Sequence, residues 1–402
     1  MKTNVAVIFG SRSCEREVAI ISAIQLMRHV NRDQYQVIPV YIHEDGHWYT
    51  GDALTNVNTF TPFDPQKHGL TSVWLDMAAG SGALMAVKND RKLFRNSQQL
   101  QMVARMDVAI IVMHGLNGED GSLQGMLELA NIPYTSTGIA GSAIGMDKIM
   151  MKQFFRGASL PVLPDTWVSR SMWEKHQDNC VESIEALGYP VFVKPANLGS
   201  SIGVSRANNL AELKDAMELA LTYDRRALVE KGLDLPIELN CSVMGYDDQV
   251  EASPIEMPLK QNHHTAVLSF GEKYQTKQSC SAGMASLTRQ LPAQIPDELR
   301  DSIQAMSKSI FQMLDCKGVV RIDYMLDRST KDWYITEINT IPGSLAFYLW
   351  TEAGIQYPEL IDRMIQYGLQ AHEEKNSHQF AYQSDILKGF SFNGKGGKWL
   401  KG

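Results

Sequence analysis

Two apolar runs, each followed by a glycine-containing loop and a helical pattern, constrain the fold of this chain most strongly. Residues 5–9 are apolar and rich in β-branched side chains, and Gly10 interrupts them before a helical pattern begins. Residues 106–113 are also apolar apart from Asp107 and lead into a loop that begins with His114, again followed by a helical pattern. A strand, a loop and a helix in this order predict an α/β unit. We therefore expect an α/β fold with a doubly wound parallel sheet at the N-terminus.

Both loops are candidate ligand sites, because ligands of doubly wound sheets bind beyond the carboxyl ends of the strands. Glu15 and Glu17 lie at the start of the first helix, where they either face a ligand or interact favourably with the helix dipole. His114 is placed like a ligand contact, but a buried structural histidine explains the local pattern equally well. Both alternatives stay open at this point.

The composition is that of a globular protein with two or three domains, with 402 residues, 44% of them hydrophobic and 21% charged. The chain has no run of about 18 apolar residues and no signal-peptide pattern at its N-terminus, so we expect a cytoplasmic protein that does not contact a membrane. A net charge of −7 argues against nucleic acid as a partner. The five cysteines are scattered and form no C-x-x-C pair, which favours neither a disulfide framework nor a zinc site.

Changes in pattern divide the chain into segments. The first domain is predicted to span residues 1–140, because a new helical segment begins near Met146. Within this domain, residues 44–105 have a weak pattern with a few short strands and are interpreted as an insertion. The tail, residues 371–402, lacks a core-forming period and is predicted to be flexible.

Residues 319–343 read as two strands joined by a polar turn. Side chains alternate along a strand, so Arg321 and Asp323 share one face of the first strand, and Glu337 and Asn339 share one face of the second. Two carboxylates and an amide then converge, which is the kind of oxygen-rich set that Mg²⁺ requires. The segment therefore predicts a magnesium-nucleotide site, and the alternative is a half-buried structural hairpin with a polar face.

Residues 189–205 form a second informative segment. A buried-looking strand carries Lys194 and is followed by small residues whose backbone N–H groups and hydroxyls can cradle a phosphate. The spacing is not that of a P-loop. Gly199 to Gly203 also fits the G-x-S-x-G pattern of serine hydrolases, but that pattern needs a strand-turn-helix context, and Asn209 is the first good start of a helix.

Two further segments carry side chains that a nucleotide site would use. Glu230 and Glu238 lie on consecutive predicted strands and can accept hydrogen bonds from ribose hydroxyls or an exocyclic amine, although lone glutamates are more often surface charges. Residues 269–286 have loop composition with Lys273 and Tyr274, as expected for a lid over phosphates and also for an ordinary solvated loop.

Taken together, these motifs resemble the ATP-grasp superfamily, and most closely the D-alanine-D-alanine ligase family. The resemblance covers residues 4–370, and the insertion is similar to that of the longer D-alanine-D-X ligases. The ordered set of motifs is Glu15-Arg-Glu17, His114 to Gly121, Met146 to Lys148, Val193-Lys194-Pro195, Gly199 to Gly203, Arg321-Ile-Asp323 and Glu337 to Gly343.

The resemblance implies an ATP-grasp fold that is α/β in the first domain and α+β in a central subdomain, residues 141–232, and a C-terminal subdomain, residues 233–370. ATP would bind between the last two. The enzyme would phosphorylate the carboxylate of one D-amino acid, and the amine of a second would displace the phosphate to give a dipeptide for peptidoglycan precursors. The implied partners are D-amino acids and ATP, with two Mg²⁺ ions that Mn²⁺ can replace, and members of the family are often homodimers.

The resemblance also implies roles for individual residues. Lys148, Lys194 and Lys273 would bind the ATP phosphates, and Asp323, Glu337 and Asn339 would hold magnesium. Arg321 and the Gly343 N–H group would stabilise the tetrahedral oxyanion. The nucleotide would also be contacted by Ser201, Glu230, Leu233 and Glu238. A hydrogen-bonded triad beside the first amino acid would consist of Glu17, Ser200 and Tyr274. The substrates would be contacted by His114, Tyr348 and Leu349.

Two departures from the family pattern concern specificity. Tyr348 stands where the family places a serine that binds the carboxylate of the second substrate, and Gly232 stands where some members place an aromatic residue against the adenine. Tyr274 keeps the lid tyrosine of members that use amino acids. The alternatives are therefore a ligase for D-serine or another acceptor, another ATP-grasp dipeptide ligase, and a non-catalytic ATP-binding regulator, against which the retention of Arg321 argues.

Overall fold

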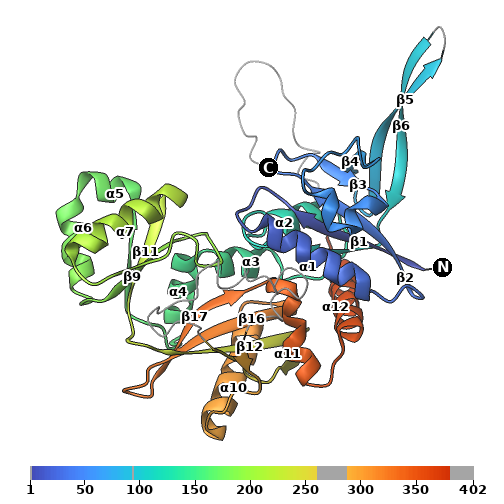
Figure 1. The fold of residues 1–402 in the computed structure, drawn as a ribbon. Helices are drawn as coiled ribbons and strands as arrows, with labels where there is room; N and C mark the ends of the chain where they lie inside the picture. Colours follow the sequence, from blue (N-terminus) through green and yellow to red (C-terminus); the bar gives the residue numbers. More distant parts are fainter. Residues whose placement is uncertain (1, 93–94, 260–287, 381–402) are drawn as a thin grey trace, which may run out of the picture.

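The computed structural model describes residues 2–92, 95–259 and 288–380, which form three sheets with their helices. Figure 1 shows the sheets in three lobes: an N-terminal lobe, a central lobe with α5, α6 and α7, and a C-terminal lobe with β12, β16 and β17. The predicted α/β class is confirmed by a parallel core in the first sheet and by antiparallel pairing in the other two. In the described residues, no helix is long and apolar enough to span a membrane.

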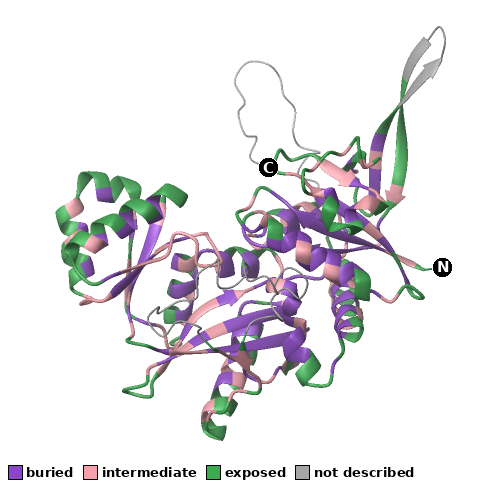
Figure 2. Cartoon of the chain, viewed as in Figure 1, coloured by how far each residue is buried: buried purple, intermediate pink, exposed green. Residues whose placement is uncertain are grey.

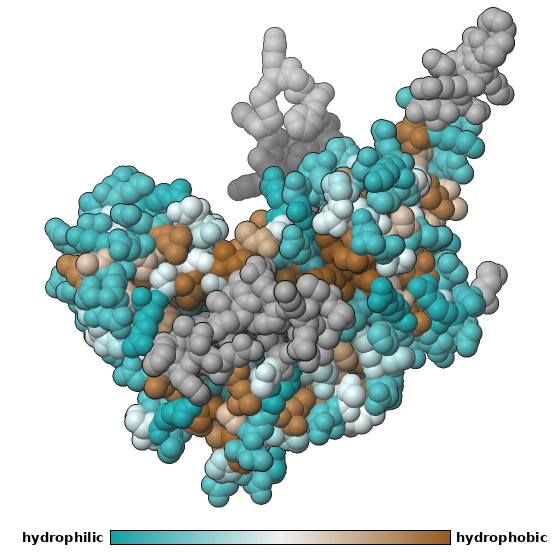
Figure 3. Space-filling model, in the orientation of Figure 1, coloured by the Kyte–Doolittle hydropathy of each residue, from teal (hydrophilic) through white to brown (hydrophobic). Residues whose placement is uncertain are grey.

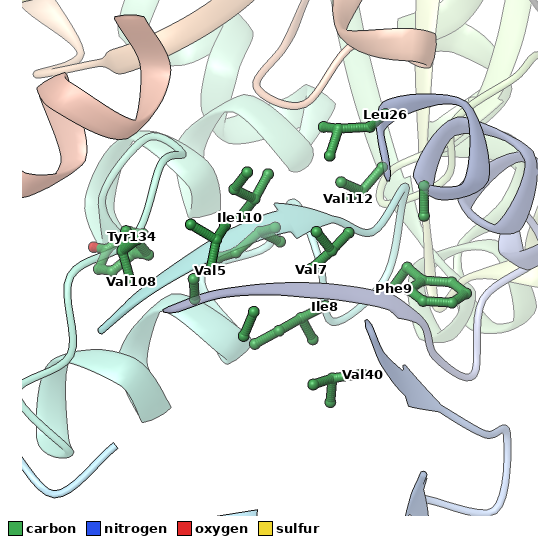
Figure 4. Close-up of a cluster of buried hydrophobic side chains, with 14 of the residues drawn as sticks. Val5, Val7, Ile8, Phe9, Leu26, Val40, Val108, Ile110, Val112 and Tyr134 are labelled. Atoms are coloured by element: carbon green, nitrogen blue, oxygen red, sulfur yellow. The ribbon is translucent and has the colours of Figure 1, made fainter. Parts of the chain in front are cut away.

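The first sheet is built on β1 (Thr3–Gly10), which pairs in parallel with β2 (Tyr35–Ile42) on one side and β7 (Val108–Val112) on the other. These strands are almost continuously apolar because helices cover the sheet. Figure 4 shows their side chains gathered with Leu26 of α1 (Arg16–His29) in one buried cluster. The loops that follow β1 and β7 consequently emerge side by side at one edge of the sheet.

The segment predicted as an insertion extends this sheet with antiparallel strands beyond β2. These are β3 (Trp48–Thr50), β4 (Thr71–Leu75), β5 (Ala83–Lys92) and β6 (Arg95–Arg105), in the order β6-β5-β4-β3-β2. The predicted short strands are present, but β5 and β6 are longer than expected and form a ribbon that projects from the body of the lobe (Figure 1). Two short 3₁₀ helices, Asp52–Thr55 and Val57–Thr59, connect β3 to β4.

The central sheet has the order β10-β9-β11-β8, with β8 (Asp165–Ser169), β9 (Val191–Pro195), β10 (Ser205–Ala207) and β11 (Arg226–Lys231). The helices α5 (Arg170–Lys175), α6 (Gln177–Glu185) and α7 (Leu210–Tyr223) cover one face of it. Their outer surfaces are exposed in Figure 2 and hydrophilic in Figure 3. The loop from Gly199 to Gly203 joins β9 to β10 and not to a helix, so the serine hydrolase alternative is wrong.

The third sheet has the order β13-β12-β16-β17, with β12 (Ile237–Tyr246), β13 (Gln249–Ala252), β16 (Lys317–Leu326) and β17 (Trp333–Asn339). The strand-turn-strand prediction for residues 319–343 is therefore confirmed. The helix α10 (Asp297–Met313) packs on this sheet, and β14 (Met257–Pro258) pairs with β15 (Arg289–Gln290) beside it.

Five further α-helices complete the described part of the chain. These are α2 (Ser122–Leu129), α3 (Ile139–Met146), α4 (Lys148–Gly157), α11 (Phe347–Glu352) and α12 (Tyr357–Ser377). The tail predicted to be flexible begins at residue 371, but α12 continues to Ser377. Glu374 accepts from the hydroxyl of Tyr246 and Lys375 pairs with Glu128, which holds this last part of the helix. Residues 381–402 lie outside the described part of the chain.

Gly318 in β16 provides a test of how the first and third lobes fit together. Its φ is +78°, and a Cβ atom placed there would lie 2.1 Å from the carbonyl oxygen of Thr135. We expect Gly318→Ala to lower the free energy of unfolding by about 3 kcal/mol or more. The new Cβ atom would clash with the Thr135 backbone, and alanine is also disfavoured at a positive φ. Gly354→Ala is the control, since Gly354 has a φ of +88° and no atom within 4 Å.

Chemical denaturation of the two variants measures this difference. The control is expected to lose only about 1 kcal/mol, the penalty for the left-handed conformation alone. Equal losses in the two variants would mean that the lobes do not approach each other as closely at Gly318 as the structure shows.

Candidate active site

A cleft with about 860 Å³ of empty space lies between the central and C-terminal sheets. The central lobe contributes Lys194 at the end of β9 and the loop that follows it. The C-terminal lobe contributes side chains of β12, β16 and β17. The cleft is lined by Lys148, Lys194, Leu198, Gly199, Ser201, Val204, Glu238, Asn240, Glu256, Pro258, Arg321, Asp323, Tyr324, Met325, Thr336 and Glu337.

The wall formed by β16 and β17 brings the four predicted side chains together. In the antiparallel register, Asp323 lies opposite Glu337, and Arg321 lies opposite Asn339. The guanidinium of Arg321 binds Asp323 with two bonds, Nε to Oδ1 at 2.6 Å and Nη2 to Oδ2 at 2.7 Å. Asn339 donates to Oδ2 of Asp323 at 3.0 Å, and Nζ of Lys148 lies 3.3 Å from Oε2 of Glu337.

This arrangement of charges suits a hard cation. Two carboxylates directly opposite each other on neighbouring strands repel, and here each is balanced by a basic side chain, Asp323 by Arg321 and Glu337 by Lys148. Asn339 adds a carbonyl oxygen, and carboxylate and amide oxygens with water and phosphate are what Mg²⁺ prefers. Within the described chain, no cluster of three or more His, Cys, Asp or Glu side chains suits a metal. A cation at this site therefore also needs the amide oxygen of Asn339 and the oxygens of a bound phosphate.

A buried ion pair network holds Lys194. The carboxylate of Glu230 is 1% exposed and contacts Nζ of Lys194 through one oxygen and Nζ of Lys152, at 2.8 Å, through the other. Burial alone would raise the pKa of Glu230, but the two ammonium groups outweigh it and lower the pKa to about 2. Both carboxylate oxygens of Glu230 therefore bind lysines, and the contact of this residue with adenine or ribose stays a prediction.

The glutamate that faces the cleft from the first lobe is Glu15, not Glu17. The hydroxyl of Ser200 donates to Oε1 of Glu15, and a Cβ atom on Gly199 would lie 2.5 Å from its Oε2. Glu15 is buried, whereas Glu17 lies in the first turn of α1 and is exposed to solvent. The prediction for Glu17 is corrected accordingly, since the helix begins one residue after Glu15 and turns the second glutamate away.

His114 is a buried link between lobes. Its Nδ1 lies 2.8 Å from the carbonyl oxygen of Ile341, so Nδ1 carries the proton and donates. Its Nε2 then accepts from the hydroxyl of Ser22 at 3.1 Å, and that hydroxyl oxygen accepts from the N–H of Ser344 at 3.1 Å. Burial lowers the pKa of His114 to about 4, although the bond to Ile341 acts in the opposite direction. The imidazole is therefore neutral with both nitrogens bonded within the protein, which favours the structural alternative over a substrate contact.

Glu119 holds the other side of the Ile341 peptide. Its Oε1 accepts from the N–H of Ile341 at 3.0 Å, and its Oε2 accepts from the N–H of Gly115 at 2.8 Å. Burial raises the pKa of Glu119 to about 8, and the charge of Glu15 raises it further against these two hydrogen bonds. Two side chains of the first lobe, His114 and Glu119, thus fix both polar groups of a residue that lies between Asn339 and Gly343.

The turn after Gly343 has an unusual backbone. Ser344, Leu345 and Ala346 all have positive φ values, of 50°, 54° and 48°. This conformation costs about 1–2 kcal/mol per residue. The N–H groups of Ser344 and Leu345 are bonded to Ser22 and to the carbonyl of Pro342, and burial of all three residues keeps the turn in place.

The other predicted residues have mixed placements. Ser201 and Glu238 line the cleft, and Tyr348 is buried beside Glu256. The side chain of Leu349 is fully buried in a small apolar cluster with Ala346 and does not line the cleft, so its assignment to the substrate stays a prediction. Leu233 is half-buried after β11 and does not line the cleft either. Lys273 and Tyr274 lie outside the described residues.

Sequence reasoning missed Glu119, Lys152 and Glu256. Glu119 belongs to the loop that begins with His114, where Asp120 is also acidic. The sequence therefore does not indicate which of these two carboxylates is buried. Lys152 lies one helical turn after Lys148, a spacing that places both on one face of α4 and was an available signal. Glu256 had no local signal, because its partners come from residues 240, 289 and 348.

Comparison with known proteins decides the family. The family model described as D-ala D-ala ligase N-terminus matches residues 4–137, and the one described as D-ala D-ala ligase C-terminus matches residues 154–366. The chain belongs to the D-alanine-D-alanine ligase family. Members of the D-alanine-D-alanine ligase family are ATP-dependent ligases, so the predicted family and enzyme class are confirmed and the regulator alternative loses its support.

Relatives and solved structures match this D-alanine-D-alanine ligase family member over nearly its whole length. The D-alanine–D-alanine ligase of Thermosipho africanus is 35% identical over 385 residues, with 96% of this chain and 98% of the relative covered. That of Geobacillus kaustophilus is 34% identical over 390 residues, with coverages of 96% and 100%.

The solved structures agree with the ATP-grasp fold. The structure of the VanG D-Ala:D-Ser ligase from Enterococcus faecalis has a TM-score of 0.73 and 27% identity, with 92% of this chain and 100% of that chain covered. The D-alanine-D-alanine ligase from Coxiella burnetii has a TM-score of 0.72 at 24% identity, with coverages of 94% and 96%, and shows the fold alone.

Glu119 is predicted to matter for turnover through the position of Ile341. We expect Glu119→Gln to lower kcat by about 10-fold or more, because an amide nitrogen would face one of the two backbone N–H groups. Asp120→Asn is the matched control, since Asp120 accepts from the N–H groups of Asn117 and Ser122 within its own loop. Steady-state ADP release measures both variants, and equal effects would contradict the special role of the bond to Ile341.

His114 is predicted to make stability depend on pH. Its pKa is about 4 in the folded protein and 6.5 in the unfolded chain, so the unfolded chain binds a proton first as pH falls. This contribution to stability is present above pH 6.5 and is lost toward pH 4, by on the order of 3 kcal/mol.

Urea denaturation at several pH values, compared between the wild type and His114→Asn, isolates this contribution. The difference in unfolding free energy between the two proteins is expected to shrink as the pH falls from 6.5 to 4. His378→Asn, at an exposed position, serves as the control. A difference that stays constant over this range would mean that the histidine is not held neutral.

Proposed function

We propose that this protein is an ATP-dependent ligase that joins two D-amino acids through an acyl phosphate, with D-alanine as the first choice for both. The observation that carries the proposal is the meeting of two chemistries in one cleft. Lysines and carboxylates that suit a magnesium nucleotide line the cleft together with Arg321. Gly199 lines the same cleft and lies against Glu15, which accepts from the hydroxyl of Ser200. The names of the relatives, D-alanine–D-alanine ligases, support the choice of substrate.

In the first step, ATP phosphorylates the carboxylate of the first amino acid. Lys148 and Lys194 neutralise phosphate charge, which is most of what phosphoryl transfer asks of a protein. Lys194 is kept in position by Glu230, and Lys152 balances the remaining charge of that carboxylate, so an ammonium faces the cleft at a fixed place. Glu15, oriented by the hydroxyl of Ser200, accepts the ammonium of the first amino acid.

In the second step, the amine of the second amino acid attacks the acyl phosphate and phosphate leaves. The tetrahedral intermediate carries an oxyanion, which Arg321 and the N–H of Gly343 stabilise; one such donor is commonly worth about 3 kcal/mol. Because Asp323 holds the guanidinium of Arg321 with two bonds, the donor is in place before substrate arrives. The amine loses a proton in this step, and the products are a dipeptide, ADP and phosphate.

Asp323, Glu337 and Asn339 are the residues that would hold magnesium. Bound there, the cation would neutralise charge on the ATP phosphates. We further propose that the enzyme acts in the cytoplasm, with D-amino acids and ATP as partners, and that it forms a homodimer. D-serine as the second substrate is the alternative. Tyr348 in place of the family's serine favours it, as does the similarity to the VanG D-Ala:D-Ser ligase.

ADP release measured with each D- and L-amino acid in turn tests the proposal. Stimulation by D-alanine, with D-alanyl-D-alanine as the product in mass spectrometry, is expected. Stimulation by L-alanine but not by D-alanine would contradict the proposed substrate, and a lack of stimulation by every amino acid would contradict ligase activity itself.

Glu337→Gln tests the magnesium assignment. We expect turnover to fall by about 100-fold while the melting temperature stays near that of the wild type, because a ligand is weakened and no cavity opens. Glu298→Gln, in the exposed first turn of α10, is the control with the same chemical change. A large drop in melting temperature with near-normal activity would show that Glu337 is structural.

A further inference from the structure

A buried polar cluster on the wall of the cleft has no part in the reaction as described so far. Its centre is the carboxylate of Glu256, which is 1% exposed. Oε1 of Glu256 lies 2.8 Å from Nη1 of Arg289, and Oε2 accepts from Nδ2 of Asn240 and from the hydroxyl of Tyr348, both at 3.1 Å. Three donors from three different elements thus hold one carboxylate.

Arg289 is fixed on two sides. The carbon of its guanidinium lies 3.9 Å from the centre of the Tyr348 ring, a cation–π contact, while Glu256 binds its Nη1. Its backbone belongs to β15, which pairs with β14 directly after Glu256. The arginine therefore keeps one orientation, with its side chain 10% exposed.

The cluster lies next to the place where the second amino acid must react. Glu256 and Asn240 line the same cleft as Arg321, and Tyr348 lies in α11 directly after the left-handed turn that follows Gly343. The charges of Glu256 and Arg321 both act on the hydroxyl of Tyr348, whose pKa burial raises above its usual range, so the phenol stays protonated and donates to Glu256. Tyr348 is thereby committed to orienting its neighbours.

Packing alone does not explain these residues. A buried ion pair seldom stabilises a fold more than apolar side chains of similar size. A guanidinium, by contrast, is well suited to binding a carboxylate, because its planar set of donors matches the two oxygens. We propose that Arg289, oriented by Glu256 and Tyr348, binds the carboxylate of the second substrate. The inference rests on the proposed function and specifies its acceptors as amino acids with a free α-carboxylate.

A competition between two acceptors that differ only in the carboxylate tests the inference. ATP, D-alanine and D-alaninol are mixed with the full-length enzyme, and mass spectrometry gives the ratio of D-alanyl-D-alanine to D-alanyl-D-alaninol. This ratio reports relative kcat/KM for the acceptor step and is independent of how much active enzyme each preparation contains. We expect Arg289→Met to lower the ratio by about 10- to 100-fold, the worth of a hydrogen bond to a charged group.

Controls separate binding from a structural role. Arg289→Lys keeps the charge without the planar donors and should give an intermediate ratio, and Arg300→Met, on the exposed face of α10, should leave the ratio unchanged. An unchanged ratio in both Arg289 variants, whatever their total yield, would overturn the assignment. If the wild type formed neither product, the proposed function itself would fail and this inference with it, whereas an unchanged ratio would leave the proposed function intact.

Discussion

The repulsion between Asp323 and Glu337 is the constraint on which the cleft wall formed by β16 and β17 depends. The two carboxylates lie opposite each other across β16 and β17 in a partly buried cleft, so each needs a positive neighbour to offset the repulsion. Arg321 and Lys148 supply that charge. The proposed reaction uses both groups, Arg321 for the oxyanion and Lys148 for phosphate. In the proposed reaction, a bound magnesium nucleotide would replace Arg321 and Lys148 as the partners of the two carboxylates, so that no buried charge would be left unpaired.

The first lobe holds the end of this wall in position. His114 and Glu119 hold the two polar groups of the Ile341 peptide, and Ser22 holds the next turn through Ser344. Glu15 from the same lobe meets Ser200 from the central one. Residues from three lobes thus meet at the candidate active site, and the hydrogen bonds between them have fixed directions. We therefore expect a shift of one lobe to change the position of the backbone near Gly343.

How much the sequence predicts follows from how local each feature is. The strand pair with Arg321, Asp323, Glu337 and Asn339 was predictable, because alternation along two strands decides which side chains share a face. The sequence does not distinguish Glu15 from Glu17, because both lie at the start of one helix and only the folded structure shows which side chain is buried. The roles of Glu230 and Glu256 were out of reach, since their partners lie far along the chain and only the folded sheets bring them together.

The most direct test of the account is the Mg²⁺ dependence of ADP binding, measured by calorimetry with and without the cation. If the carboxylate pair holds the cation of the nucleotide, ADP should bind at least about 10-fold more tightly with Mg²⁺, and Asp323→Asn should remove most of this difference. Equal affinity of the wild type for ADP in Mg²⁺ and in a chelator would contradict the account.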